Sequence, residues 1–139
     1  MKVDIQEMNE NEIIEEIQTL CEKREFAKLK NLLSEMNPAD IASVLDEVSA
    51  NQRLLMFRLL AKEEAAETFV ELDSDNQESL IHAFSDSELK EVLDELYLDD
   101  AVDVIEEMPA TVVKRILRNA DSKMRESINT LLKYPEDSA

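Results

Sequence analysis

Apolar residues recur along this chain with a spacing of twelve. A second apolar pair follows eight and nine residues into most units, as at Val44 and Leu45 or Val92 and Leu93, and weakens at Thr68/Phe69 and Ile128/Asn129. Such spacing is typical of the buried face of a short helix, so each unit predicts a helix of roughly ten residues. The positions twelve apart are Met36, Val48, Leu60, Leu72, Phe84, Leu96, Met108, Ala120 and Leu132.

The position five residues into each unit alternates in character, which doubles the repeat to 24 residues and two helices. Turn residues agree with this register, because Asn37-Pro38, Ser49, Asp73, Ser85, Pro109 and Asp121 fall at unit starts, as N-caps or first-turn residues do. The alternating position is apolar at Ile41, Ala65, Leu89 and Val113, polar at Arg53, Gln77 and Arg125, and neutral at Ala101.

Helices this short are marginal alone, so their stability must come from stacking one helix pair on the next. The sequence therefore predicts an all-α fold, a superhelix or solenoid of short helix pairs with a 24-residue repeat, similar to armadillo proteins. We expect a single α-helical domain over residues 1–139, with leading helices in 1–35 and four two-helix repeats in 36–132.

Composition supports the helical class. The chain has no glycine and only 4% aromatic residues. Phosphate-cradling loops and tight β-hairpins use residues that tolerate positive φ, so the lack of glycine argues against both. The single Cys21 fits a reducing compartment and is expected to be a buried thiol. No apolar run is long enough for a membrane span, and no signal-peptide pattern begins the chain.

Charge limits the possible partners. Fifteen basic residues against 33 acidic ones give a formal net charge of −18, which repels nucleic acids and anionic lipid surfaces. We therefore expect no nucleic-acid partner and no direct membrane contact by this domain.

The basic and histidine side chains indicate no catalytic site. His82 has no Cys, Asp or His at ligand spacing, and no Ser-His-Asp or Cys-His set can be assembled. Scattered basic residues, Arg53 and Arg115 among them, are expected on solvated helix faces. The sequence therefore predicts a protein that is not an enzyme.

One stretch carries an unusual density of negative charge. Asp99 and Asp103 lie four residues apart and so share a helix face, where an exposed like-charge pair costs a few tenths of a kcal/mol unless a cation offsets it. Oxygen ligands without His or Cys favour a hard ion such as Mg²⁺. The alternative is a solvated acidic face on which Asp99 or Asp100 caps a helix. Between Glu91 and Val113 the chain has no base and eight acids, namely Glu91, Asp94, Glu95, Asp99, Asp100, Asp103, Glu106 and Glu107.

Three segments in order resemble one known family. LSEMNPADIASVLDEV (33–48), ELYLDDAVDVIEEM (95–108) and LLKYPEDSA (131–139) are similar to the N-terminal cytosolic domain of MgtE-type magnesium transporters. The resemblance covers the chain from about Asn31 to Ala139 and implies a superhelix of short helices. It also implies that residues 133–139 begin a linker to a CBS module and a membrane pore of the same full-length chain, which acts as a homodimer.

The resemblance also implies a function at the cytoplasmic face of the cell membrane. In that family the domain senses intracellular Mg²⁺, which it binds jointly with the CBS domains to close the pore at high Mg²⁺. The ligand positions match Glu67, Asp99 and Asp103, as metal half-sites, with Asp100 and Glu107 as outer neighbours. The alternative is a metal-independent protein-interaction solenoid related to the middle region of the flagellar motor switch protein FliG.

Overall fold

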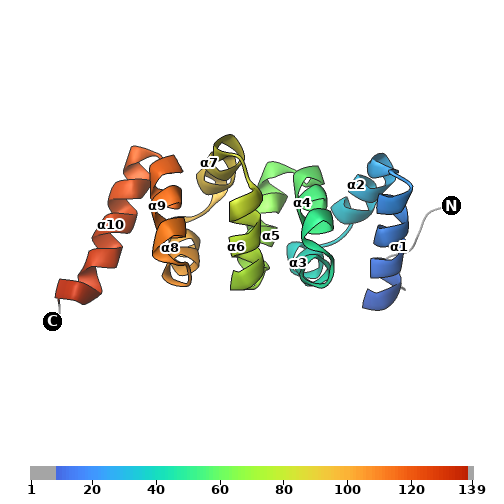
Figure 1. The fold of residues 1–139 in the computed structure, drawn as a ribbon, viewed down its shortest axis with the longest axis horizontal. Coiled ribbons are helices and arrows are strands. Elements are labelled where there is room, and N and C mark those ends of the chain that lie inside the picture. The colour runs from blue at the N-terminus through green and yellow to red at the C-terminus, as the bar shows by residue number, and fades with distance from the viewer. Residues whose placement is uncertain (1–8, 138–139) are drawn as a thin grey trace. The chain divides into compact units, whose positions relative to one another are not determined.

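The structure, a computed structural model, describes residues 9–137, with side chains to residue 131, and contains ten α-helices and no strand in that range (Figure 1). This confirms the all-α class. From α3 to α10 the helices begin every twelve residues, and α3 to α9 contain nine or ten residues each, as the spacing predicts. The helices are α1 (Glu10–Glu22), α2 (Phe26–Ser34), α3 (Pro38–Glu47), α4 (Ala50–Leu59), α5 (Lys62–Glu71), α6 (Ser74–Ala83), α7 (Asp86–Glu95), α8 (Leu98–Glu106), α9 (Ala110–Asn119) and α10 (Ser122–Asp137).

The predicted turn residues begin these helices. Asn37, Ser49, Asp73 and Ser85 are N-caps whose side chains accept a hydrogen bond from the backbone N–H three residues later. Ser49 and Ser85 complete capping boxes with Gln52 and Glu88, which satisfies two orphan donors at each helix start. Local sequence therefore sets where each short helix begins.

The chain divides into two compact units, one ending at Leu72 and the other beginning at Asp73. In the first unit α3 packs on α5 and α2 packs on α4; in the second α7 packs on α9 and α8 packs on α10. Each of these stacks joins helices 24 residues apart, which agrees with the two-helix repeat. The continuous superhelix and the single domain with its internal boundaries stay predictions; residues 133–137 continue α10.

The residues twelve apart lie where helices end. Val48, Leu72, Phe84, Leu96 and Ala120 are C-cap residues and are buried. The helix interior contributes the predicted pairs, such as Val44 with Leu45 and Val92 with Leu93, which are also buried. Most units of twelve therefore bury both a helix face and the connection that follows it. Met36 and Met108 are buried too, Leu60 is half-buried, and the side chain of Leu132 lies outside the described residues.

The prediction that Arg53 lies on a solvated helix face is wrong. Its side chain is only 7% exposed, and its guanidinium donates to two carbonyls at the end of α3. Nε lies 2.8 Å from the oxygen of Leu45, and Nη2 lies 2.9 Å from that of Val48. The last carbonyls of a helix have no partner within it, so a buried cation here satisfies them and interacts favourably with the helix dipole.

Arg125 repeats this arrangement three two-helix repeats later. Its Nε donates to the oxygen of Leu117 at 2.8 Å, and its Nη2 donates to that of Ala120 at 3.0 Å, so it caps α9 as Arg53 caps α3. The side chain of Arg125 is exposed, unlike that of Arg53. The polar positions of the alternation thus include a recurrent C-capping site.

Thr68 is a polar residue in the apolar core of the first compact unit. It is 0% exposed on α5, and its hydroxyl has no hydrogen-bond partner in the described structure. Its equivalents Val44, Met56 and Val92 are apolar. An unpaired buried hydroxyl costs free energy, which makes α5 a weak point of the core.

Arg24 is the one non-glycine residue with positive φ in the described range, at 56°. It follows the C-cap of α1, where the N–H of Arg24 donates to the oxygen of Cys21 and the N–H of Glu25 donates to that of Leu20. This is a Schellman ending, which glycine normally occupies because it has no Cβ. A chain without glycine forms it at a conformational cost.

Arg24→Gly should therefore raise the free energy of unfolding by about 0.5–1 kcal/mol, the left-handed penalty less the added freedom of the unfolded chain. Urea denaturation followed by the helical signal at 222 nm measures it. Arg24→Ala, which keeps the Cβ, is the matched control. Equal stability of the two variants would contradict the explanation.

Candidate functional site

The acidic run lies on α7 and α8. Tyr97 is the N-cap residue of α8 and makes no side-chain capping bond, while Asp99 and Asp100 lie in the first turn. Neither aspartate is therefore the cap, although negative charge in the first turn is favourable with respect to the helix dipole. The carboxylates of Asp99 and Asp103 are thus positioned by α8 but make no capping hydrogen bond to it.

Asp99 and Asp103 are both exposed and stand one turn apart on α8, whose buried side is made by Ala101, Val104 and Ile105. The two carboxylates thus share the exposed side of α8, as predicted. Among the described residues neither carboxylate forms an ion pair. No neighbouring base offsets their mutual repulsion. A bound cation would therefore stabilise this pair more than a pair that already has a basic partner.

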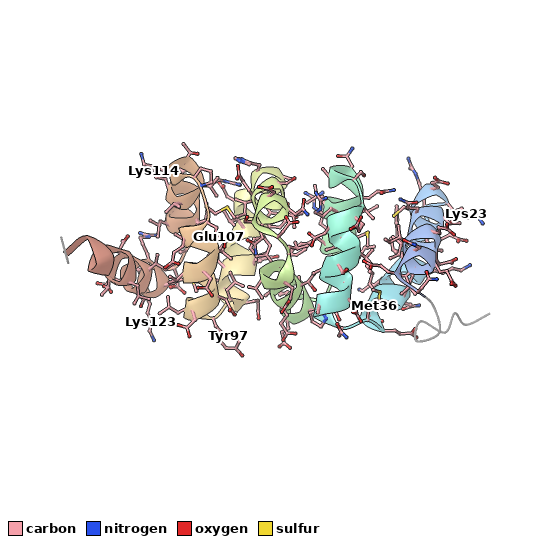
Figure 2. The ribbon with its side chains drawn as sticks, turned by 90° about the horizontal axis from the view of Figure 1, so that it is seen from below. Lys23, Met36, Tyr97, Glu107, Lys114 and Lys123 are labelled. Carbon is pink, nitrogen blue, oxygen red and sulfur yellow. The ribbon has the colours of Figure 1, made fainter. Side chains whose placement is uncertain are left out.

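The other end of α8 is also acidic. Glu107 is its C-cap residue, Glu106 precedes it, and no basic residue lies in the last turn. Negative charge at a helix C-terminus is unfavourable because the helix dipole is negative there. Figure 2 shows Tyr97 and Glu107 at the two ends of the helix. In the neighbouring α7, by contrast, Asp94 is paired, since Lys90 Nζ lies 3.3 Å from its Oδ2.

Glu67 lies exposed on α5, in the first compact unit, whereas Asp99 and Asp103 belong to the second. Burial, and after it the charge of Glu67, raise the pKa of Glu64 on the same helix. Glu67 thus repels a partly buried neighbour. Across residues 9–131, no three His, Cys, Asp or Glu side chains come together as a metal site. The three residues therefore stay candidate ligands, one in the first unit and two in the second.

Tyr97 is a surface feature that the sequence analysis did not single out. It is 79% exposed, and Figure 2 shows its ring pointing away from the ribbon. Its position just before the acidic helix gives that surface one large apolar group. The only signal in the sequence was its place outside the apolar pairs and the residues twelve apart.

The remaining reactive groups have ordinary surroundings. His82 is exposed, and its Nε2 lies 3.4 Å from Oε2 of Glu78 on the same helix. Cys21 is half-buried, and burial together with the charge of Glu22 raises the pKa of its thiol. A raised pKa lowers the thiolate fraction, so Cys21 lacks the electropositive setting of a nucleophile. Within the described range no helix is both long and apolar enough to cross a membrane.

The fold and this surface define an acidic, all-helical repeat domain. The family model of the MgtE intracellular N domain matches residues 36–137, beginning at the first of the residues twelve apart. The chain belongs to the family of MgtE intracellular N domains, which confirms the resemblance found in the sequence.

Relatives agree with this assignment. The magnesium transporter MgtE of Thermus thermophilus is 28% identical over 134 residues, 94% of this chain and 30% of the relative. The crystal structure of the cytosolic domain of the Mg²⁺ channel MgtE in complex with ATP has a TM-score of 0.70 at 27% identity, over 81% of this chain and 47% of that chain.

A crystal structure of the soluble part of a magnesium transporter has a TM-score of 0.77 at 18% identity, over 91% of this chain and 50% of that chain, and supports the fold. The chain spans half or less of the length of each of these three proteins.

Proposed function

We propose that this chain is the Mg²⁺-sensing regulatory domain of a magnesium transporter or channel, acting at the cytoplasmic face of the membrane. The observation that carries the proposal is the exposed Asp99 and Asp103 pair, without a basic partner, in a member of the MgtE intracellular N domain family. Its partners are a CBS module and a pore domain of the same full-length chain, which assembles as a homodimer.

Asp99 and Asp103 fit a hard divalent ion because they supply two exposed carboxylates one helical turn apart. Mg²⁺ typically takes one or two protein carboxylates and keeps several waters. Glu67 supplies a further carboxylate in the first unit. Each is half of a site, and the other ligands belong to neighbouring domains, so we expect weak binding by the isolated domain.

The regulatory effect follows from charge. Facing acidic surfaces repel one another, and a bound divalent ion neutralises them, so Mg²⁺ favours the compact arrangement of the cytosolic domains through its higher affinity for that state. Closure of the pore at high intracellular Mg²⁺ is the consequence. Several weak sites acting together would make the response steep.

Asp99→Asn combined with Asp103→Asn should reduce the protection by Mg²⁺ against proteolysis in a longer chain that includes the CBS module. The folded state of this domain should persist, because both side chains are exposed. Limited proteolysis across a Mg²⁺ series, with circular dichroism as the check on folding, measures both properties.

The matched control is Glu91→Gln with Glu95→Gln, an exposed acid pair with the same spacing on α7. Equal protection in the Asp99/Asp103 variant and the unaltered chain would refute the site. Equal loss in both double variants would mean that total charge, and not α8, sets the response.

The exposed Tyr97 favours a second function, a protein-interaction surface that works without metal. A Mg²⁺ titration of the domain, followed by NMR of backbone amides around Glu67 and from Asp99 to Glu107, separates the two. Localised, saturable shifts favour the sensor. Diffuse, salt-like shifts, together with partner binding that is insensitive to Mg²⁺, favour the interaction surface.

A further inference from the structure

The prediction that Arg115 lies on a solvated helix face is wrong. Its side chain extends from α9 to the connection between α6 and α7. Its side chain is only 22% exposed. Nη1 donates to the oxygen of Ile81, and Nη2 donates to that of Phe84 at 2.6 Å, so the guanidinium caps the end of α6. The same group contacts Oδ1 of Asp86, at 3.1 Å from Nη2 and 3.3 Å from Nε.

Asn119 completes this cluster. Its Nδ2 donates to the backbone oxygen of Arg115 at 2.9 Å and lies 3.5 Å from Oδ1 of Asp86. The guanidinium thus has acceptors on the last turn of α6, on its C-cap and on the first residue of α7. Its planar fork suits this set of acceptors, which an ammonium group cannot contact in the same way.

The reach of Arg115 distinguishes it from the other two capping arginines. Arg53 and Arg125 cap the helix immediately before their own, through carbonyls five and eight residues away. Arg115 caps α6 across 31 and 34 residues. It therefore closes a long loop of chain, which contains all of α7 and α8.

The closed segment from Asp86 to Arg115 contains the acidic run. Between Glu91 and Val113 there are eight acids and no base, and the contacts of Arg115 lie at the two ends of the segment. Like charges so close together repel, and this repulsion favours opening of the segment. A cation that holds its ends together opposes that opening.

We infer that Arg115 is a clasp, a conformational device that ties α9 to the corner between α6 and α7 and holds the acidic segment 86–115 closed. Without the clasp, this corner opens locally while the remainder of the second unit stays folded. The clasp does not depend on the proposed binding of Mg²⁺, since every contact in it is made within this chain.

The test is native-state hydrogen exchange without added Mg²⁺, comparing Arg115→Met with the unaltered chain. Corner amides are those of Phe84, which donates to Leu80, and of Glu88 and Leu89, which donate to Ser85. Their exchange should become about tenfold faster, the effect of losing charge-assisted bonds of ordinary strength. The amide of Ala101 on α8 lies outside this corner, so its exchange rate should change by less than about twofold, which is within the ordinary scatter in hydrogen-bond strength.

Two further variants keep the test decisive. Arg115→Lys retains charge but loses the fork, so it should give a smaller acceleration at the same amides, and it replaces Arg115→Met as the test if that chain does not fold. Arg118→Met, an exposed arginine one turn further along α9, should leave the corner unchanged. Equal acceleration throughout the second unit, or none at the corner, would overturn the clasp.

Salt separates a clasp that acts against repulsion from a merely structural cap. Raising NaCl from about 0.05 M to about 0.5 M shortens the screening length and weakens repulsion among the acids. The acceleration in Arg115→Met should then fall at least twofold. An acceleration independent of salt would show that Arg115 only satisfies the carbonyls of α6, and would overturn its role in holding the acidic segment closed.

Discussion

Replacing Leu93 with alanine should lower the free energy of unfolding by about 2–5 kcal/mol, the range for a buried leucine that leaves a cavity. Leu93 is buried on α7, beside Val92 in the apolar pair of its unit. Helices of ten residues have little stability of their own, so the loss falls on the packing between repeats. Urea denaturation followed at 222 nm gives the change in free energy.

Asp94→Ala is the control for Leu93→Ala, since Asp94 is the next residue on the same helix and is exposed. It should cost less than about 1 kcal/mol, because its ion pair with Lys90 lies at the surface. A cost for Leu93→Ala as small as that of the control would mean that the buried face of α7 has been assigned wrongly.

The repeat was predictable because it depends on short-range physics. Apolar spacing reports the buried face of each helix, and caps such as Ser49 and Ser85 report its start, so a few residues determine each twelve-residue unit. How the helix pairs stack on one another depends instead on many weak contacts between repeats, and the spacing of apolar residues does not reveal that stacking.

The site was predictable only in part, for a related reason. Asp99 and Asp103 share the exposed side of α8 because residues four apart on a helix must do so. Arg115 was expected in solvent, because its acceptors are backbone carbonyls more than thirty residues away, and every residue has such a carbonyl. Arg53 and Arg125 did leave a signal, since they occupy the same position of the 24-residue repeat.

Arg53→Met should lower the free energy of unfolding by about 2–3 kcal/mol, because it removes two charge-assisted hydrogen bonds from buried carbonyls. Methionine keeps the length of the apolar stem, so packing is largely retained. Arg53→Lys keeps the charge but loses the planar fork, so its free energy of unfolding should lie between those of the unaltered chain and Arg53→Met. The change is measured by urea denaturation, as for Leu93.

Arg125→Met is the matched control for Arg53→Met, because Arg125 makes the same two bonds to a helix end from an exposed position. Water can replace the guanidinium there, so the cost should stay below about 1 kcal/mol. Some buried ion pairs can be exchanged for apolar residues with a gain in stability, because desolvation of the charges is costly. Equal costs for the two variants would refute burial as the source of the difference. A stabilised Arg53→Met would show that the desolvation cost of Arg53 exceeds the contribution of its hydrogen bonds.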